Sequence, residues 1–205
     1  MLDHILLGCN NLDRGIDLVE KHTGVRAAFG GVHPGRGTRN ALLSLGEKHY
    51  LEIIAPDPKQ SHVPDHYGLH KLSEPRLVGW AVHPGDLTQF ANHLREGAFE
   101  FEGPTPGSRK RPDDRLLQWR TLNLKNDYSG LLPFFIEWSA DTIHPSVDSP
   151  SGCKIVRFTY AGPDYDGIGR LFDLMGLEIL AEVGEKSQIR ASINGPEGKV
   201  FDATS

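Results

Sequence analysis

The chain has 205 residues, with 22 lysines and arginines against 27 aspartates and glutamates, a formal net charge of −5 at pH 7 and a pI near 6.0. Charges of both signs are mixed along it, which excludes the basic surface that nucleic acid or anionic lipid demands. No apolar run approaches the ~18 residues that span a bilayer, and no signal-peptide pattern opens the chain. We therefore expect a soluble, unprocessed, cytoplasmic protein with neither nucleic-acid nor membrane partners.

The two cysteines indicate the same compartment. Cys9 and Cys153 lie far apart and fit no paired metal-ligand spacing. Isolated cysteines of this kind behave as small buried hydrophobes rather than as a disulfide framework. A reducing cytoplasm is the interpretation that fits both.

The first part of the chain predicts a strand, a helix and a hairpin. Leu2–Leu7 is short and aliphatic and is followed by turn formers, which is typical of a strand. Apolar residues recur at helical spacing within Leu12–Thr23. Gly30–Gly37 is too rich in glycine for regular structure and predicts a loop. The hairpin then comprises Asn40–Leu45 and Tyr50–Ile54.

The same order of elements returns twice, which indicates repetition of one unit. Polar, proline-rich stretches separate the copies, at Pro56–Pro75 and Asp141–Gly152. The second and third copies are predicted as strand Leu77–Val82, helix Leu87–Glu96 and strands near 98–101, 116–122 and 134–138, then strand Lys154–Tyr160, helix Asp166–Met175 and strands near 177–183, 188–193 and 199–202.

A single βαβββ unit has an apolar sheet face that its one helix cannot cover, so such units should pair around a cleft. The predicted fold is therefore α+β, with repeated βαβββ units forming cupped mixed β-sheets and helices on the outer face. Residues 1–150 would hold two units, 1–56 and 76–140. Residues 151–205 would form a third, shorter unit, packed on the others or in a dimer interface. Because this odd unit lacks an internal mate, we expect a homodimer.

Several motifs together resemble a glyoxalase-like domain of the vicinal oxygen chelate superfamily, which also contains bleomycin-resistance proteins and dioxygenases. The resemblance covers about the first three quarters of the chain. It is carried by Asp3-His4, Thr23-Gly24-Val25, the segment Gly30–Leu42, Tyr50-Leu51-Glu52, Gly107–Asp113 with Trp119, Pro133–Trp138 and His144-Pro145.

The resemblance implies a divalent metal, either iron, manganese, nickel or zinc, bound by the first and last strands of two paired units. Carried over by position, the ligands are His4, Glu52 and Glu137. The fourth position falls on Gly79 or Trp80, neither of which has a ligating side chain. One imidazole and two carboxylates form a set that binds hard to borderline divalent cations and leaves positions open.

Other candidate site residues surround these ligands. His33, in the glycine-rich loop, and His144 are candidate catalytic bases, and Asn40 is placed to hydrogen-bond a substrate carbonyl. Arg109 and Arg111 belong to a compact basic group suited to holding a carboxylate or phosphate.

Structural alternatives stay open for every one of these candidates. His4 is equally consistent with a histidine satisfied by backbone groups, and Glu52 and Glu137 with ion pairs or an exposed edge. A plain β-turn loop also accounts for the segment around His33. A solvated loop accounts for the basic run.

Three functions are compatible with this pattern. The first is a metal-dependent enzyme of lyase, isomerase or dioxygenase type, whose cation polarises an oxygen of a small oxygenated substrate. The second is a non-catalytic protein that sequesters a small molecule in the same cleft, as bleomycin-resistance proteins do. The third is a metal-free scaffold whose acidic residues pair with Arg109 or Arg111.

Overall fold

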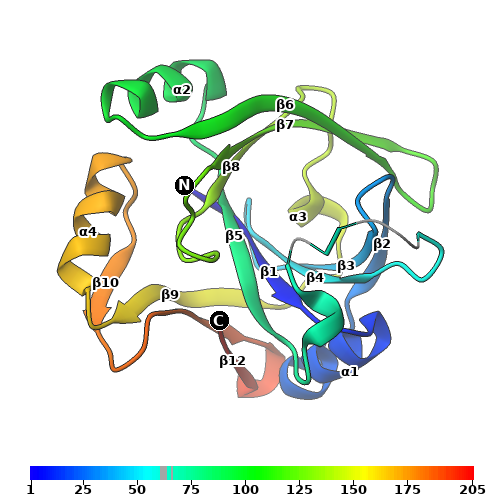
Figure 1. Cartoon of the computed structure of the whole chain (residues 1–205). Helices are drawn as coiled ribbons and strands as arrows, with labels where there is room; N and C mark the ends of the chain where they lie inside the picture. Colours follow the sequence, from blue (N-terminus) through cyan, green and yellow to red (C-terminus); the bar gives the residue numbers. More distant parts are fainter. Residues whose placement is uncertain (61–63, 66) are drawn as a thin grey trace.

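The computed structural model describes residues 1–60, 64, 65 and 67–205, which form an eight-stranded and a four-stranded sheet (Figure 1). Part of the predicted separator Pro56–Pro75, namely residues 61–63 and 66, lies outside the described residues. The described part of that stretch contains a short 3-10 helix, η1 (Leu69–Lys71).

Two halves of identical strand order build the larger sheet, whose order is β2-β3-β4-β1-β5-β8-β7-β6. In each half the first strand pairs in parallel with the last, and the halves join through the antiparallel pair β1 and β5. Their elements are β1 (Leu2–Gly8), α1 (Leu12–Thr23), β2 (Ala28–His33), β3 (Thr38–Ser44) and β4 (Tyr50–Pro56), then β5 (Arg76–Val82), α2 (Leu87–Glu96), β6 (Phe101–Lys110), β7 (Leu116–Leu124) and β8 (Phe134–Trp138), followed by α3 (Pro145–Asp148).

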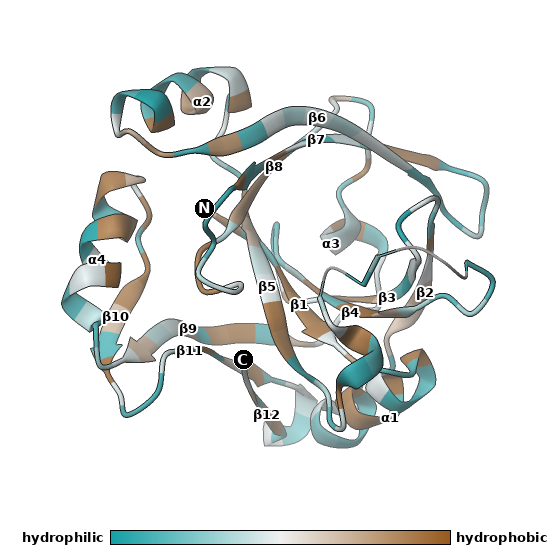
Figure 2. Ribbon diagram, viewed as in Figure 1, coloured by the Kyte–Doolittle hydropathy of each residue, from teal (hydrophilic) through white to brown (hydrophobic). Residues whose placement is uncertain are grey.

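Side-chain alternation gives the curled sheet an apolar outer face and a more polar inner face. On β1, Ile5 and Leu7 point outward into the main core with Ile16 and Val19 of α1, whereas His4 points inward. Figure 2 shows hydrophobic segments along β1 and β5, and α1, α2 and α4 lie outside the curl. The main core therefore lies outside the sheet and leaves the inner face free for a site.

The sheet curls until its two edge strands, β2 and β6, come into contact (Figure 1). A Cβ at Gly31, whose φ is +141°, would lie 2.7 Å from the carbonyl oxygen of Lys110 on β6. Gly30 sits in a bulge of the β2–β3 ladder. The predicted loop Gly30–Gly37 is therefore wrong in its first part, because these glycines belong to a strand and permit this close approach.

The strand predicted near 98–101 also differs from the structure. The observed β6 begins at Phe101 and continues to Lys110, through Pro104 and Pro106. As an edge strand, β6 tolerates prolines that cannot donate to a ladder. Because of these prolines, the composition of residues 101–110 did not predict so long a strand.

Residues 151–205 follow the expected element order but not the strand order of the two halves. The first strand of this segment, β9, lies between β10 and β11 in the order β10-β9-β11-β12. It pairs in parallel with β10, the second strand of the segment, rather than with β12, the last. The elements are β9 (Lys154–Gly162), α4 (Tyr165–Leu174), β10 (Leu180–Val183), β11 (Gln188–Asn194), the 3-10 helix η2 (Pro196–Gly198) and β12 (Val200–Thr204).

This smaller sheet packs on the outside of the larger one. Trp80 of β5 contacts the rings of Phe158 and Phe172 edge-on, with centroids 5.0 and 5.9 Å apart. The three side chains belong to the same core as α1 and α2. Because Phe172 belongs to α4, Trp80 packs on the face of the smaller sheet that carries this helix, and the expected homodimer stays a prediction.

Both cysteines, Cys9 and Cys153, are buried and free, which confirms that they behave as small hydrophobes. Across residues 1–60, 64, 65 and 67–205, no helix is long and apolar enough to cross a membrane.

Gly31→Ala should destabilise the fold by about 2–4 kcal/mol, because its Cβ meets a backbone oxygen that cannot rotate away and its φ disfavours a side chain. Gly35→Ala is the matched control, since Gly35 also has a positive φ but has nothing within 4 Å of its Cβ position. The control should cost about 1 kcal/mol. Urea unfolding measures both variants, and equal costs would show that close packing of β2 on β6 is unimportant.

Candidate functional site

The inner face of the curled sheet encloses a cavity of about 880 Å³. The first half lines it with polar side chains, including His4, Glu52 and His33. The wall from β8 is apolar and consists of Phe134, Ile136 and Trp138, which alternate along the strand. A small organic molecule with polar and apolar parts matches such a lining.

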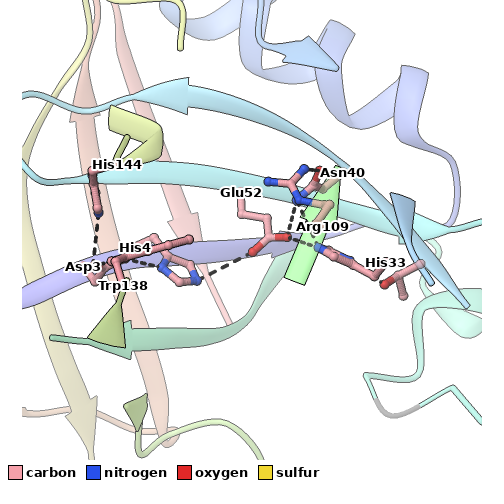
Figure 3. A network of polar contacts seen from close by, with 9 residues as sticks. Asp3, His4, His33, Asn40, Glu52, Arg109, Trp138 and His144 are labelled. Carbon is pink, nitrogen blue, oxygen red and sulfur yellow. Dashed lines mark hydrogen bonds and ion pairs between the residues drawn. The ribbon is translucent and has the colours of Figure 1, made fainter. Parts of the chain in front are cut away.

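Asp3 and His4 form a buried pair on β1. Neighbouring strand residues normally face opposite sides, but the register of β1 against β5 shifts between Leu2 and His4, and this bulge brings the two side chains together. His4 Nδ1 lies 2.7 Å from Asp3 Oδ1 (Figure 3). Because a carboxylate only accepts, Nδ1 carries the proton and Nε2 is directed toward Glu52.

The His4 ring is held by aromatic neighbours as well. It stacks on Tyr50 of the adjacent strand at 4.4 Å and meets Phe134 edge-on at 5.5 Å. His4 is 3% exposed and Tyr50 is also buried, and burial raises the pKa of the Tyr50 hydroxyl well above its usual range. Tyr50 therefore stays neutral and serves as a platform for His4.

Asp3 contacts Trp138 and His144 as well as His4. Its second oxygen, Oδ2, accepts from Trp138 Nε1 at 3.0 Å and lies 3.2 Å from His144 Nε2. Burial alone would raise the pKa of Asp3, but the hydrogen bonds from His144 and His4 and the charges of these two rings outweigh it and lower the pKa. Asp3 is therefore a carboxylate at neutral pH.

Glu52 is a buried carboxylate on β4 that faces the same cavity. Its Oε1 accepts from Asn40 Nδ2 at 2.6 Å, and its two oxygens lie 3.6 Å from His33 Nε2 and His4 Nε2 (Figure 3). Burial would raise the pKa of Glu52, yet the neighbouring rings, the Asn40 hydrogen bond and the charge of Arg109 lower it. Glu52 is therefore also ionised.

His33 is neutral in this setting. Its Nδ1 lies 2.8 Å from Thr38 Oγ1, and its Nε2 lies 3.4 Å from the amide nitrogen of Asn40, which only donates. Burial lowers the pKa of His33 to about 4. The charge of Arg109 acts in the same direction, whereas the charge of Glu52 acts to raise this pKa. His33 Nε2 thus accepts from Asn40 and makes no hydrogen bond to the Glu52 carboxylate, which lies 3.6 Å away.

Asn40 and Arg109 link the two edges of the sheet. Asn40 Oδ1 accepts from Arg109 Nη1 at 2.6 Å, and the other end of the amide donates to Glu52. Asn40 was expected to bind a substrate carbonyl, but both ends of its amide hold protein groups. Its role is to join the guanidinium of Arg109 to the carboxylate of Glu52.

His144 was expected to act as a base, and the structure places it behind the site instead. It lies at the N-terminus of α3, with Nδ1 2.7 Å from Ser146 Oγ and Nε2 facing Asp3. Among the described residues, those lining the cavity do not include His144. It therefore acts on His4 through Asp3.

The predicted metal ligand Glu137 does not reach the cavity. Ile136 and Trp138 line the cavity, so alternation along β8 turns Glu137 to the outer face. There its carboxylate pairs with Arg120 and accepts from the backbone N–H of Leu87 at the start of α2. The prediction for Glu137 is wrong, because this carboxylate caps a helix.

Arg111 is also absent from the cavity. Its guanidinium pairs with Asp148 at 2.5 Å, and Arg115 pairs with the same carboxylate at 2.7 Å. Arg111 lies just beyond Lys110, the last residue of β6, so strand alternation does not place it on the same face as Arg109. The expectation that Arg111 binds substrate is therefore wrong.

The donor set does not fit the metal centre that the family resemblance implied. His4 and Glu52 are donors of a suitable kind, and Asp3 supports His4 as a carboxylate supports many metal-bound histidines. Catalytic metals are usually held by three protein ligands. In the part of the chain that is described, however, no group of three His, Cys, Asp or Glu side chains is placed to hold a metal ion.

Asp3, Tyr50 and Trp138 were not predicted as site residues. The signal for Tyr50 and Trp138 was alternation, since each is two residues from a position that faces the cavity. Asp3 gave no such signal, because strict alternation would place it opposite His4. Only the bulge on β1 brings it to the site.

The sequence comparison identifies a glyoxalase-like domain, whose family model matches residues 2–172. A comparison with curated proteins finds no significant match.

Solved structures share the fold at low sequence identity. A hypothetical protein from Staphylococcus aureus aligns with a TM-score of 0.66 and 16% identity over 98% of this chain and 84% of that one. Methylmalonyl-CoA epimerase from Streptomyces coelicolor, in complex with 2-nitronate-propionyl-CoA, gives 0.50 and 19% over 71% and 98%. A hypothetical protein from Bacillus halodurans gives 0.50 and 15% over 70% and 96%. The predicted cupped α+β fold is confirmed.

The neutral, buried His33 should make folding stability sensitive to acid. Its pKa is about 4 when folded and about 6.5 when unfolded. The unfolded chain therefore binds the proton first, and stability present above pH 6.5 is lost as the pH falls to 4. We expect a loss of about 3 kcal/mol in urea unfolding.

The variant His33→Gln is the comparison that isolates this contribution, because carboxylates titrate in the same range in both proteins. The difference in unfolding free energy between wild type and variant should shrink as the pH falls from 6.5 to 4. Parallel pH series would contradict a buried neutral His33.

Proposed function

We propose that this chain, which belongs to the glyoxalase-like domain family, is an enzyme that transfers a proton on a small oxygenated substrate, in an isomerase- or lyase-type reaction. The observation that carries the proposal is the orientation of His4. Asp3 holds its Nδ1–H at 2.7 Å and leaves Nε2 directed into the cavity. A histidine held by a buried carboxylate in this way is suited to act as a general base.

The neighbouring groups support this role. When His4 takes a proton on Nε2 it becomes positively charged, and the carboxylates of Asp3 and Glu52 lie on its two nitrogens. In a buried site with low dielectric such charges stabilise the imidazolium strongly. The same proton can then be returned to another position of the substrate, or to a leaving group, which distinguishes an isomerase from a lyase.

The opposite wall supports the proposal in a different way. Phe134, Ile136 and Trp138 offer no acid or base, so they serve to bind the substrate and keep water away from His4. A solved structure with this fold is named as an epimerase, which is an isomerase, although its 19% identity carries the fold alone. The role of His4 rests on the geometry of the site.

His4→Gln should lower the rate of proton transfer by a factor of about 10²–10⁴, the contribution typical of a general base. The measurement is deuterium uptake from D₂O, followed by NMR, over a panel of 2-oxo acids, methyl ketones and methylmalonyl-CoA. Uptake reports proton removal whatever the final product is.

Glu52→Gln should slow the same exchange, and Glu137→Gln is its matched control on the outer face of the sheet. Melting temperatures show whether each variant folds. Undiminished exchange in a folded His4→Gln protein would remove His4 as the base.

We propose further that this activity needs no resident divalent metal, because the donor set lacks a third protein ligand. Tag-free protein should contain well below one equivalent of iron, manganese, nickel or zinc by plasma emission spectrometry, and a chelator should leave deuterium exchange unchanged. One equivalent that is lost in both His4→Ala and Glu52→Ala would contradict this expectation.

A second candidate function is sequestration of a small molecule without catalysis. The apolar wall of β8 favours it, since Phe134, Ile136 and Trp138 can bind a small molecule but cannot react with it. A compound that binds tightly and shows no deuterium exchange and no turnover would support sequestration over catalysis.

A further inference from the structure

Arg109 is a buried cation without a carboxylate in direct contact. It is 4% exposed, lines the cavity, and forms no ion pair with any described residue. Among the described residues, its one hydrogen-bond partner is neutral, the amide oxygen of Asn40 on Nη1, and its Nε has none. A buried guanidinium normally has an anion against it, because desolvation of the charge is costly.

The fold is shaped to keep Arg109 in this position. A Cβ at Gly30 would lie 2.7 Å from Arg109 Nη1, and one at Gly31 would lie 3.2 Å from the same atom. Larger side chains at these two positions would push the guanidinium away from the cavity. The glycines of β2 therefore serve the placement of this charge as well as the closure of the sheet.

Local charges also favour an anion at this end of the cavity. Arg36 adds a second cation beside His33, whereas Glu52 is the carboxylate at this end, already bonded to Asn40. Glu102 lies seven residues from Arg109 along β6, about 23 Å at normal strand rise. The remaining charges of the described lining are Arg76 and Asp127.

We propose that Arg109 binds the carboxylate of a small organic acid, whose apolar body lies against the wall of Phe134, Ile136 and Trp138. A planar carboxylate matches the fork of a guanidinium and would supply this buried charge with a counter-ion. Resting on the proposed function, this orientation places the carbon that exchanges its proton between Arg109 and His4. The substrate class is therefore a carboxylic acid with a small apolar or aromatic body.

Benzoate is a suitable probe because it combines a carboxylate with a flat apolar ring. Trp119 and Trp138 line the cavity, so their fluorescence should report its binding, with calorimetry as an independent measurement. Benzamide keeps the shape without the charge, and inorganic phosphate keeps the charge without the ring. Benzoate should bind saturably, and benzamide should bind at least tenfold more weakly.

Arg109→Gln should weaken benzoate binding at least tenfold, and Arg115→Gln, an exposed arginine, is the matched control. Arg109→Lys tests the fork where Arg109→Gln fails to fold, and it should bind benzoate more weakly than wild type. Equal binding of benzamide and benzoate, or unchanged binding by the Arg109 variants, would overturn the proposal. Binding of phosphate without benzoate would overturn the carboxylate class.

This result is separable from the test of catalysis. Benzoate binding that depends on Arg109, with no deuterium exchange on any compound, would keep the anion site and remove the enzyme. Exchange that depends on His4 and is confined to neutral carbonyl compounds, without benzoate binding, would keep the enzyme and remove the anion site.

Discussion

The negative charge of Glu52 is the constraint around which the inner face is arranged. It lies on β4, a strand whose other side chains are mostly apolar, and burial would neutralise or expel it without compensation. Asn40, His4 and His33 surround the two oxygens, and the curl of the sheet brings Arg109 within one amide of them (Figure 3). The closure of the sheet therefore contributes to keeping Glu52 ionised.

The two halves of the sheet share a strand order but not a chemistry. The first half provides charged and hydrogen-bonding groups from all four of its strands, whereas β8 in the second half turns its one carboxylate outward to the start of α2. A metal bridging the halves would need donors on both sides. Here the first half supplies His4 and Glu52, the apolar wall of β8 belongs to the second half, and Arg109 of the second half is joined to the first through Asn40.

Much of this was predictable from the sequence, and the failures have physical causes. Element order and the pairing of two units follow from periodicity, and the resemblance placed His4 and Glu52 correctly on the inner face. Glu137 failed because carry-over by position ignored which face of β8 it occupies. Asp3 and Gly31 were missed because a bulge and a contact between sheet edges depend on residues far apart in the chain. The strand order of residues 151–205 is likewise set by tertiary packing.

The main core extends beyond the part of the chain that the family model matches. The family match ends at residue 172, within α4, whereas β9 needs β10 and β11 beside it to complete its ladders. Phe172 itself packs on Trp80 and Tyr160. A fragment cut at the boundary of the match would leave β9 without both of its neighbouring strands. The family match and the smaller sheet therefore end at different residues, and the last 33 residues of this sequence supply β10, β11 and β12.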